Sequence, residues 1–99
     1  RFNPNHSDAW YQRGLLYLDF GRIEEAKSDF EAAARYDKKH IDARLRIAAI
    51  LHDGEDVNSS VIAWRKVLDI DPEHRLARRR LQESVDRQEN MKQRIYPKG

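Results

Sequence analysis

The 99-residue chain has room for one small domain or a short stack of repeats, and not for two independent hydrophobic cores. Charged residues make up 36% of it and hydrophobic residues 39%, a balance typical of helical proteins with solvated outer faces. The absence of cysteine excludes disulfides, a thiol nucleophile and a thiolate metal site. No apolar run approaches the ~20 residues that a membrane-spanning helix needs. The compartment stays open, with the cytoplasm as the default expectation.

Charge is distributed unevenly along the chain. The formal net charge is +2, but residues 1–74 carry 11 Lys/Arg against 14 Asp/Glu, a net charge of −3. Residues 75–99 carry 8 Lys/Arg against 3 Asp/Glu, a net charge of +5. A basic end segment favours an acidic partner, although a run of charge is also typical of a solvated helix face.

The first two helices are predicted at residues 7–20 and 23–37. Gly21 separates them, because glycine readily adopts the left-handed backbone conformation that ends many helices. The second helix opens with Glu24 and Glu25, acidic residues that suit the positive end of the helix dipole. An apolar stripe follows at steps of three and four residues, formed by Ala26, Phe30, Ala33 and Ala34.

The next part of the chain repeats this order, with helices predicted at residues 41–53 and 57–70 and a break at Gly54. The apolar stripe of the second of these helices consists of Val57, Val61, Trp64, Val67 and Leu68. Pro72 ends that helix, and a fifth helix is predicted at residues 74–94. No window alternates apolar and polar residues as a strand does, so the predicted fold class is all-α.

Equivalent residues recur with a period of 34. His6, His40 and His74 occupy one such position, and Ala9, Ala43 and Ala77 occupy another. A period in this range indicates a solenoid, in which each helix pair buries its apolar face on its neighbours. The expected organisation is a remnant of a preceding repeat at 1–6, complete units at 7–40 and 41–74, a capping helix at 75–95 and a tail at 96–99.

Each unit carries one further pattern of seven positions. The first unit has Trp10, Arg13, Gly14, Tyr17, Ala26, Phe30 and Lys38, and the second has Arg44, Ile47, Ala48, Leu51, Ser60, Trp64 and Pro72. These residues resemble the tetratricopeptide repeat (TPR) pattern of W-x2-L-G-x2-Y, then A-x3-F, then P, in register over residues 1–81. The resemblance implies a right-handed α-solenoid of helix-turn-helix repeats that presents a surface to other proteins.

Helix packing accounts for the small residues of this pattern. Gly14 and Ala48 are expected where the two helices of a unit approach closely. Ala26 and Ser60 are expected to face them from the second helix of each unit.

The sequence contains no pattern for catalysis or metal binding. Three of the four histidines fall at equivalent turn positions of successive repeats, so their side chains are not expected to converge on one ion. No phosphate-binding glycine loop, Ser-His-Asp arrangement or H-E-x-x-H motif is present. We therefore expect neither enzyme activity nor a metal ion or cofactor.

The remaining candidate site is the concave surface, which the first helix of each unit lines in a solenoid of this kind. The residues expected there are Tyr11, Gln12, Leu15, Leu45, Arg46, Ala49, Arg79 and Arg80. Tyr11, Leu15 and Leu45 have no evident position in the core. An apolar strip beside three arginines suits a peptide with hydrophobic anchors and acidic groups. The sequence therefore predicts a non-enzymatic interaction module or scaffold that binds a partner peptide in this groove.

Two alternatives stay open at this point. Two and a half repeats with an uncovered apolar end would also suit association with a second copy of the chain. A nucleic-acid contact through the basic final helix is the other alternative, although its cations spread over several faces without interleaved aromatic residues. Those cations are Arg75, Arg78, Arg79, Arg80, Arg87, Lys92 and Arg94.

Overall fold

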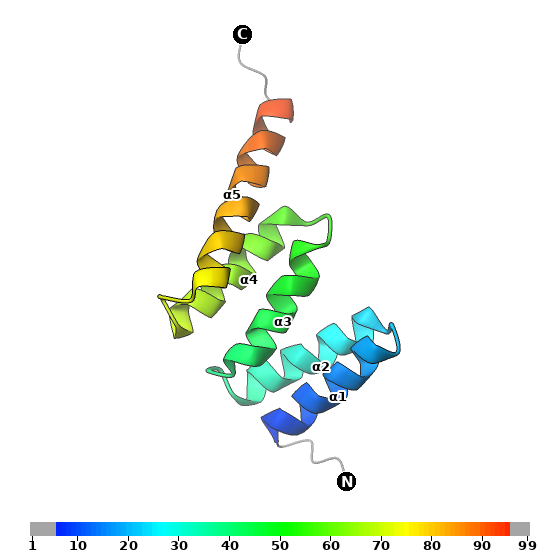
Figure 1. Ribbon diagram of the computed structural model, residues 1–99. Coiled ribbons are helices and arrows are strands. Elements are labelled where there is room, and N and C mark those ends of the chain that lie inside the picture. The colour runs from blue at the N-terminus through cyan, green and yellow to red at the C-terminus, as the bar shows by residue number, and fades with distance from the viewer. Residues whose placement is uncertain (1–5, 96–99) are drawn as a thin grey trace.

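Five α-helices joined by short turns make up the described part of the chain (Figure 1). The computed structural model describes the backbone of residues 6–95 and the side chains of residues 6–93, so the expected remnant before His6 and the tail at 96–99 lie outside it. The helices are α1 (Ser7–Asp19), α2 (Ile23–Tyr36), α3 (Ile41–His52), α4 (Val57–Ile70) and α5 (Arg75–Ile95). The predicted helix bounds agree with these to within one residue, and the all-α fold class is confirmed. Gly21, with φ of 75°, has the left-handed conformation predicted for it.

The helices form a stack of pairs. α1 packs antiparallel to α2, and α3 packs antiparallel to α4 (Figure 1). α2 also contacts α3, which joins the two pairs, and α5 packs on α4 with a smaller contact to α3. The resulting solenoid is elongated, with extents of 61 × 29 × 18 Å, and the C-terminal turns of α5 extend beyond the second pair (Figure 1).

The first pair closes over Gly14. A Cβ added there would lie 2.6 Å from Cε1 of Phe30, so the buried ring would have to shift to accommodate it. The close approach at Gly14 was predicted correctly, and the three atoms nearest to the added Cβ all belong to the large Phe30 ring. Both Phe30 and Ala26 are fully buried in α2. Glycine is needed here because it makes room for an aromatic ring.

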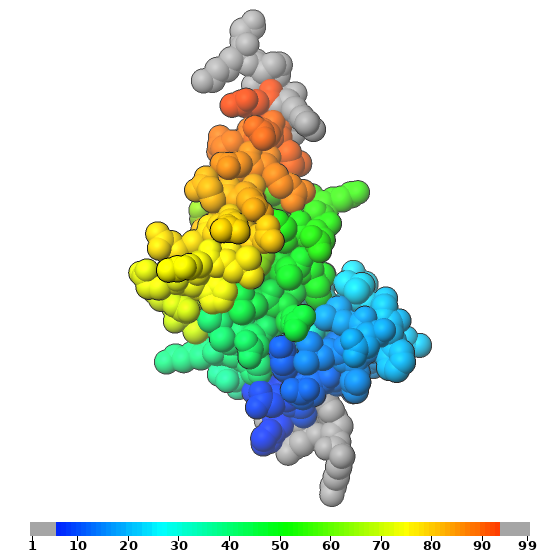
Figure 2. Space-filling view, in the orientation of Figure 1, coloured from blue at the N-terminus to red at the C-terminus, as the bar shows by residue number. Residues whose placement is uncertain are grey.

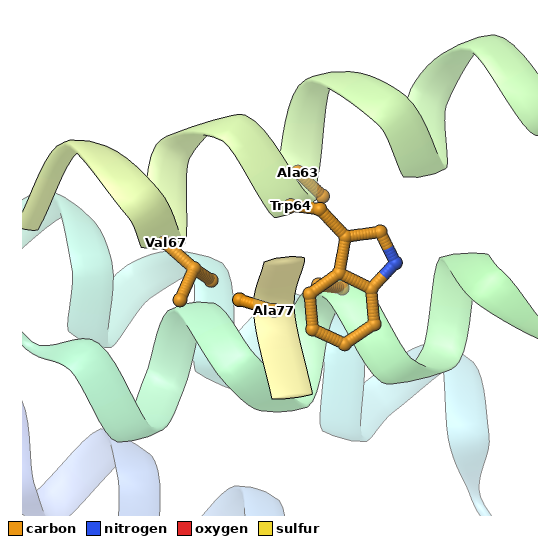
Figure 3. Packing of buried hydrophobic residues seen from close by; sticks show 5 residues of the cluster. Ala63, Trp64, Val67 and Ala77 are labelled. Carbon is orange, nitrogen blue, oxygen red and sulfur yellow. The ribbon is translucent and has the colours of Figure 1, made fainter. Parts of the chain in front are cut away.

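The second pair shares its core with α5. The buried cluster consists of Ala48 from α3, Ala63, Trp64 and Val67 from α4, and Ala77 from α5. Figure 3 shows Trp64 and Val67 extending from α4 on either side of Ala77. Trp64 is only 2% exposed, and burying an aromatic side chain of this size contributes roughly 2–3 kcal/mol.

Two of the three recurring histidines, His40 and His74, cap helices. Nδ1 of His40 accepts the backbone N–H of Ala43 at 3.1 Å, and Nδ1 of His74 accepts that of Ala77 at 3.2 Å. A nitrogen that accepts carries no proton, so the neutral ring has its proton on Nε2. In His40 this Nε2 lies 2.8 Å from Oδ1 of Asp8 and donates to it, which connects the start of α3 to the start of α1. From His40 to His74, the 34-residue period thus repeats a helix cap.

Candidate protein-binding surfaces

The residues predicted to form the groove come from α1, α3 and α5. We call the surface that these helices share the α1/α3/α5 face, and Figure 2 shows it in blue, green and yellow to orange. α1 supplies Tyr11, Gln12 and Leu15, α3 supplies Leu45, Arg46 and Ala49, and α5 supplies Arg79 and Arg80. Gln12, Arg46, Ala49 and Arg79 are exposed, and the other four are half-buried.

Two of the apolar residues on this face have structural roles. The Tyr11 ring packs against Phe30, with 5.6 Å between ring centroids, and against His40, with 5.0 Å between centroids. Leu45 packs against the buried cluster around Trp64. The expectation that Tyr11 and Leu45 lack a position in the core is therefore wrong, because Tyr11 packs on the buried Phe30 ring and Leu45 packs on the buried cluster of the second pair. Leu15 remains as a half-buried apolar residue.

The three arginines of the face differ in their surroundings. Nη1 of Arg80 donates to both carboxylate oxygens of Glu83, at 3.1 and 2.9 Å. This guanidinium, with a smaller contribution from His52, holds the pKa of Glu83 below its usual range. Arg46 and Arg79 make no hydrogen bond or ion pair through their side chains with any of the residues that the structure describes. They are the cations available to an acidic ligand.

His52, the last residue of α3, lies where α3, α4 and α5 meet. The indole N–H of Trp64 donates to His52 Nδ1 at 3.2 Å, and the Ser84 hydroxyl lies 3.3 Å from the same nitrogen. Because an indole can only donate, His52 Nδ1 is an acceptor and the proton of the neutral ring lies on Nε2. That Nε2 is 3.3 Å from Oε2 of Glu83. Its ring nitrogens are therefore occupied in joining three helices.

A recess lies away from the predicted groove, between α2 and α4 above α3. We call it the α2/α3/α4 recess; its volume is about 510 Å³. The residues lining it are Glu31, Ala34, Arg35, Lys38, Arg44, Ile47, Leu51, Ser59, Ile62, Ala63 and Lys66. None of the eight residues predicted for the groove is among them. This surface was not predicted from the sequence.

One signal in the sequence points to the recess. Ile62 lies outside the apolar stripe of α4, and the structure leaves it 55% exposed. A large aliphatic residue on the polar side of an amphipathic helix has no role in the core of its own pair. Two basic residues line the recess together with Ile62. Lys66 follows it by four residues in α4, and Arg35 lies in α2, which belongs to the preceding helix pair.

Residues 6–95 do not meet the requirements of a membrane-spanning helix or of a metal site with three or more side-chain ligands. None of the helices described there is both long enough and apolar enough to cross a membrane. Within the same residues, no group of three or more His, Asp or Glu side chains is placed to hold a metal ion.

Comparison with known proteins connects this architecture to one family. The tetratricopeptide repeat profile matches residues 7–40. A TPR repeat-containing protein of Rhizobium etli is 30% identical over 74 residues, which are 75% of this chain and 36% of that protein. The peroxisomal targeting signal receptors of Komagataella phaffii and Candida albicans are 35% and 32% identical, over 69% and 72% of this chain and 12% of each receptor. The chain thus spans about a third of the bacterial relative and about an eighth of the yeast receptors.

Proposed function

Because the chain belongs to the tetratricopeptide repeat family, whose repeats act as protein–protein interaction modules, we propose that its α1/α3/α5 face binds a peptide segment of a partner protein. The ligand we propose carries acidic groups next to a small number of apolar side chains. Relatives that are named as receptors for a targeting signal support a ligand that is a segment of another protein.

The observation that carries this proposal is the pair of exposed arginines on neighbouring first helices. Arg46 on α3 and Arg79 on α5 have no acidic partner within the described residues, and α3 and α5 are in contact. Exposed Gln12 on α1 and Ala49 on α3 add polar and small apolar surface. Because Tyr11 and Leu45 take part in packing, the face offers a ligand less apolar surface than the sequence suggested. We therefore expect its charged residues to contribute more to peptide binding than its apolar residues.

The test uses peptides selected from a display library on the immobilised 99-residue chain. Fluorescence anisotropy then gives the Kd of the tightest acidic peptide for wild type, for Arg46→Ala/Arg79→Ala and for the control Lys39→Ala/Arg65→Ala. Charge-assisted hydrogen bonds contribute roughly 1.5–3 kcal/mol each, so we expect the groove variant to bind about tenfold more weakly or worse. The control removes two exposed cations that form no ion pair with any residue the structure describes, and we expect less than about a fivefold effect.

Three results would contradict the proposal. The first is a control variant that loses binding while Arg46→Ala/Arg79→Ala keeps it, which would place the ligand elsewhere. The second is dimerisation in sedimentation experiments that the groove variant abolishes, because the face would then bind a second copy. The third is selective binding of oligonucleotides with a steep dependence on salt, which would favour the basic helix as a nucleic-acid contact.

A further inference from the structure

The rim of the α2/α3/α4 recess is strongly basic. Four cations line it: Arg35 on α2, Lys38 in the following turn, Arg44 on α3 and Lys66 on α4. Glu31 is the one acidic residue among its lining side chains. Arg44 donates through Nε to the backbone carbonyl of Lys38 at 3.0 Å, which holds it at the rim. Within residues 6–95, none of the four cations forms an ion pair.

This concentration of positive charge contrasts with the rest of the repeat body. Residues 1–74 have a net charge of −3, yet four of their 11 basic residues surround one recess. Unpaired like charges held together repel one another, and the acidic residues of this segment lie outside the recess, Glu31 excepted. An anionic ligand would relieve the repulsion.

The floor of the recess is apolar. Ile47 and Leu51 of α3 and Ala34 of α2 line it, and Ile62 of α4 reaches it with a side chain that is 55% exposed. An occupant with an aliphatic side chain would remove this isoleucine from water, and each buried methylene contributes ~0.8 kcal/mol. A small inorganic anion would leave the apolar floor in contact with water.

The size of the recess fits a short stretch of peptide. Its lining on α4 runs from Ser59 to Lys66, which is about 10 Å along the helix axis at 1.5 Å per residue. Three extended residues cover a similar length of about 10 Å. A volume of about 510 Å³ is that of a ligand-binding cleft, and a concave floor suits an inserted side chain better than it suits a flat lipid surface.

We propose that the α2/α3/α4 recess binds an acidic peptide segment of a partner protein in which one aliphatic side chain is flanked by carboxylates. The aliphatic side chain contacts Ile62 and the floor, and the carboxylates pair with Arg35 and Lys66 on the opposite walls. This site is separate from the α1/α3/α5 face. Ile47 in the recess and Ala49 on the face point about 160° apart around α3, because successive residues of a helix are rotated by about 100°.

The test measures anisotropy of the fluorescein-labelled peptide Asp-Glu-Leu-Glu-Asp against the 99-residue chain. Lys66→Glu and Arg65→Glu form a matched pair, because they make the same change of charge at adjacent exposed residues and only Lys66 lines the recess. We expect Lys66→Glu to weaken binding at least tenfold and Arg65→Glu less than threefold. Ile62→Ser should weaken it about tenfold, and replacing the leucine of the peptide with serine should have a similar effect. Unchanged melting temperatures of the protein variants would show that they remain folded.

The arms of the experiment separate this site from the function proposed above. Arg46→Ala/Arg79→Ala should bind this peptide with the same Kd as wild type. This expectation holds whether or not the α1/α3/α5 face has a ligand of its own. The recess proposal is overturned if wild type shows no binding up to about 1 mM peptide, or if Lys66→Glu and Arg65→Glu weaken binding equally. Two further sedimentation results would overturn it, if the peptide does not bind. One is binding of the chain to phosphatidylserine vesicles that Ile62→Ser abolishes. The other is dimerisation of the chain that Ile62→Ser abolishes.

Discussion

Arg13 is a charged side chain at a position that the repeat pattern fills with leucine. Its Nε and Nη2 donate to the two oxygens of Asp29 at 2.8 and 2.9 Å, and its guanidinium lies 5.0 Å from the Trp10 ring centroid and 5.7 Å from that of Tyr17. The Asp29 side chain is 5% exposed and that of Arg13 is 40% exposed. The hydrogen bonds that Arg13 donates to Asp29 raise the pKa of Arg13 and so favour its charged form. The departure from the pattern is thus compensated by a second residue, 16 positions later.

Gly14 allows a sharper test at the same scale. We expect Gly14→Ala to lower the free energy of unfolding, although alanine is the better helix former by about 1 kcal/mol, because its Cβ would lie 2.6 Å from the buried Phe30 ring. Gly14→Leu should be worse, with a loss of about 1–3 kcal/mol or more from overpacking. Gly54→Ala is the control, since its Cβ would meet nothing closer than a carbonyl oxygen at 3.4 Å. Urea denaturation measures all three, and equal stabilities of Gly14→Ala and Gly54→Ala would show that the Phe30 ring yields at no cost.

At the scale of single helices, the start of α4 depends on Asp56. Its Oδ1 accepts the backbone N–H of Ser59 at 3.2 Å, and its Oδ2 accepts the Ser59 hydroxyl at 2.6 Å. α1 has His6 in the corresponding position without a side-chain cap, and α2 follows Arg22 in the same way. Hydrogen bonds to the ionised carboxylate, led by the one from the Ser59 hydroxyl, lower the pKa of Asp56. The charged form therefore stabilises the folded state.

The pH dependence follows from the direction of this shift. A carboxyl group with a lowered pKa in the folded state contributes stability that is fully present above its ordinary value of 3.8 and is lost as the pH falls through the folded pKa. Asp56→Asn keeps an acceptor for the cap but cannot ionise. We expect wild type to have the higher melting temperature at about pH 6 and the difference to shrink as the pH falls below 3.8 and through the lowered pKa of Asp56. Other carboxyl groups, including Glu83, titrate in both proteins and cancel. If the difference in melting temperature stayed constant over this pH range, the charge of Asp56 would not contribute to stability.

Across the whole molecule, the predictable features are those with a period or a local signature. The helices followed from apolar stripes such as Ala26–Phe30–Ala33 and from Gly21, and these signals act within one or two turns of helix. The side chain that a residue meets across two helices has no such signature. The sequence therefore identified Gly14 as a close approach but not Phe30 as its neighbour, and it placed Tyr11 outside the core.

The candidate sites were harder to predict for the same reason. The groove residues could be assigned to α1, α3 and α5 from the repeat, but the pairing of Arg80 with Glu83 depends on side-chain geometry. The α2/α3/α4 recess depends on how far α3 holds α2 from α4, which no local pattern encodes. Arg35 and Lys66 line the same recess from positions 31 residues apart in the sequence. Only the assembled stack brings them together.

The stability of the stack leads to the last prediction, which concerns the proposed capping role of α5. Leu81 packs on the cluster around Trp64, Ser84 is buried with its Oγ 3.0 Å from that of Ser60, and the Gln88 amide donates to Asn58 at 2.6 Å. These contacts cover the second helix pair along about two turns of α5. If the helix is a cap, Leu81→Asp should lower the free energy of unfolding by about 2 kcal/mol or more, because it places a charge without a partner in an apolar contact.

Thermal unfolding followed by circular dichroism measures this effect, and each kcal/mol corresponds to about 4–8 °C in a domain of this size. Leu76→Asp is the matched control, since Leu76 lies on the same helix with 45% of its surface exposed and should shift the melting temperature by only a few degrees. Deleting residues 79–99 should expose the sides of Trp64 and Val67 that α5 covers, and it should abolish cooperative unfolding. Should that shortened chain remain a cooperatively folded monomer, α5 would be dispensable to the two helix pairs, and its basic surface would be better understood as an arm for a ligand than as the end of the core.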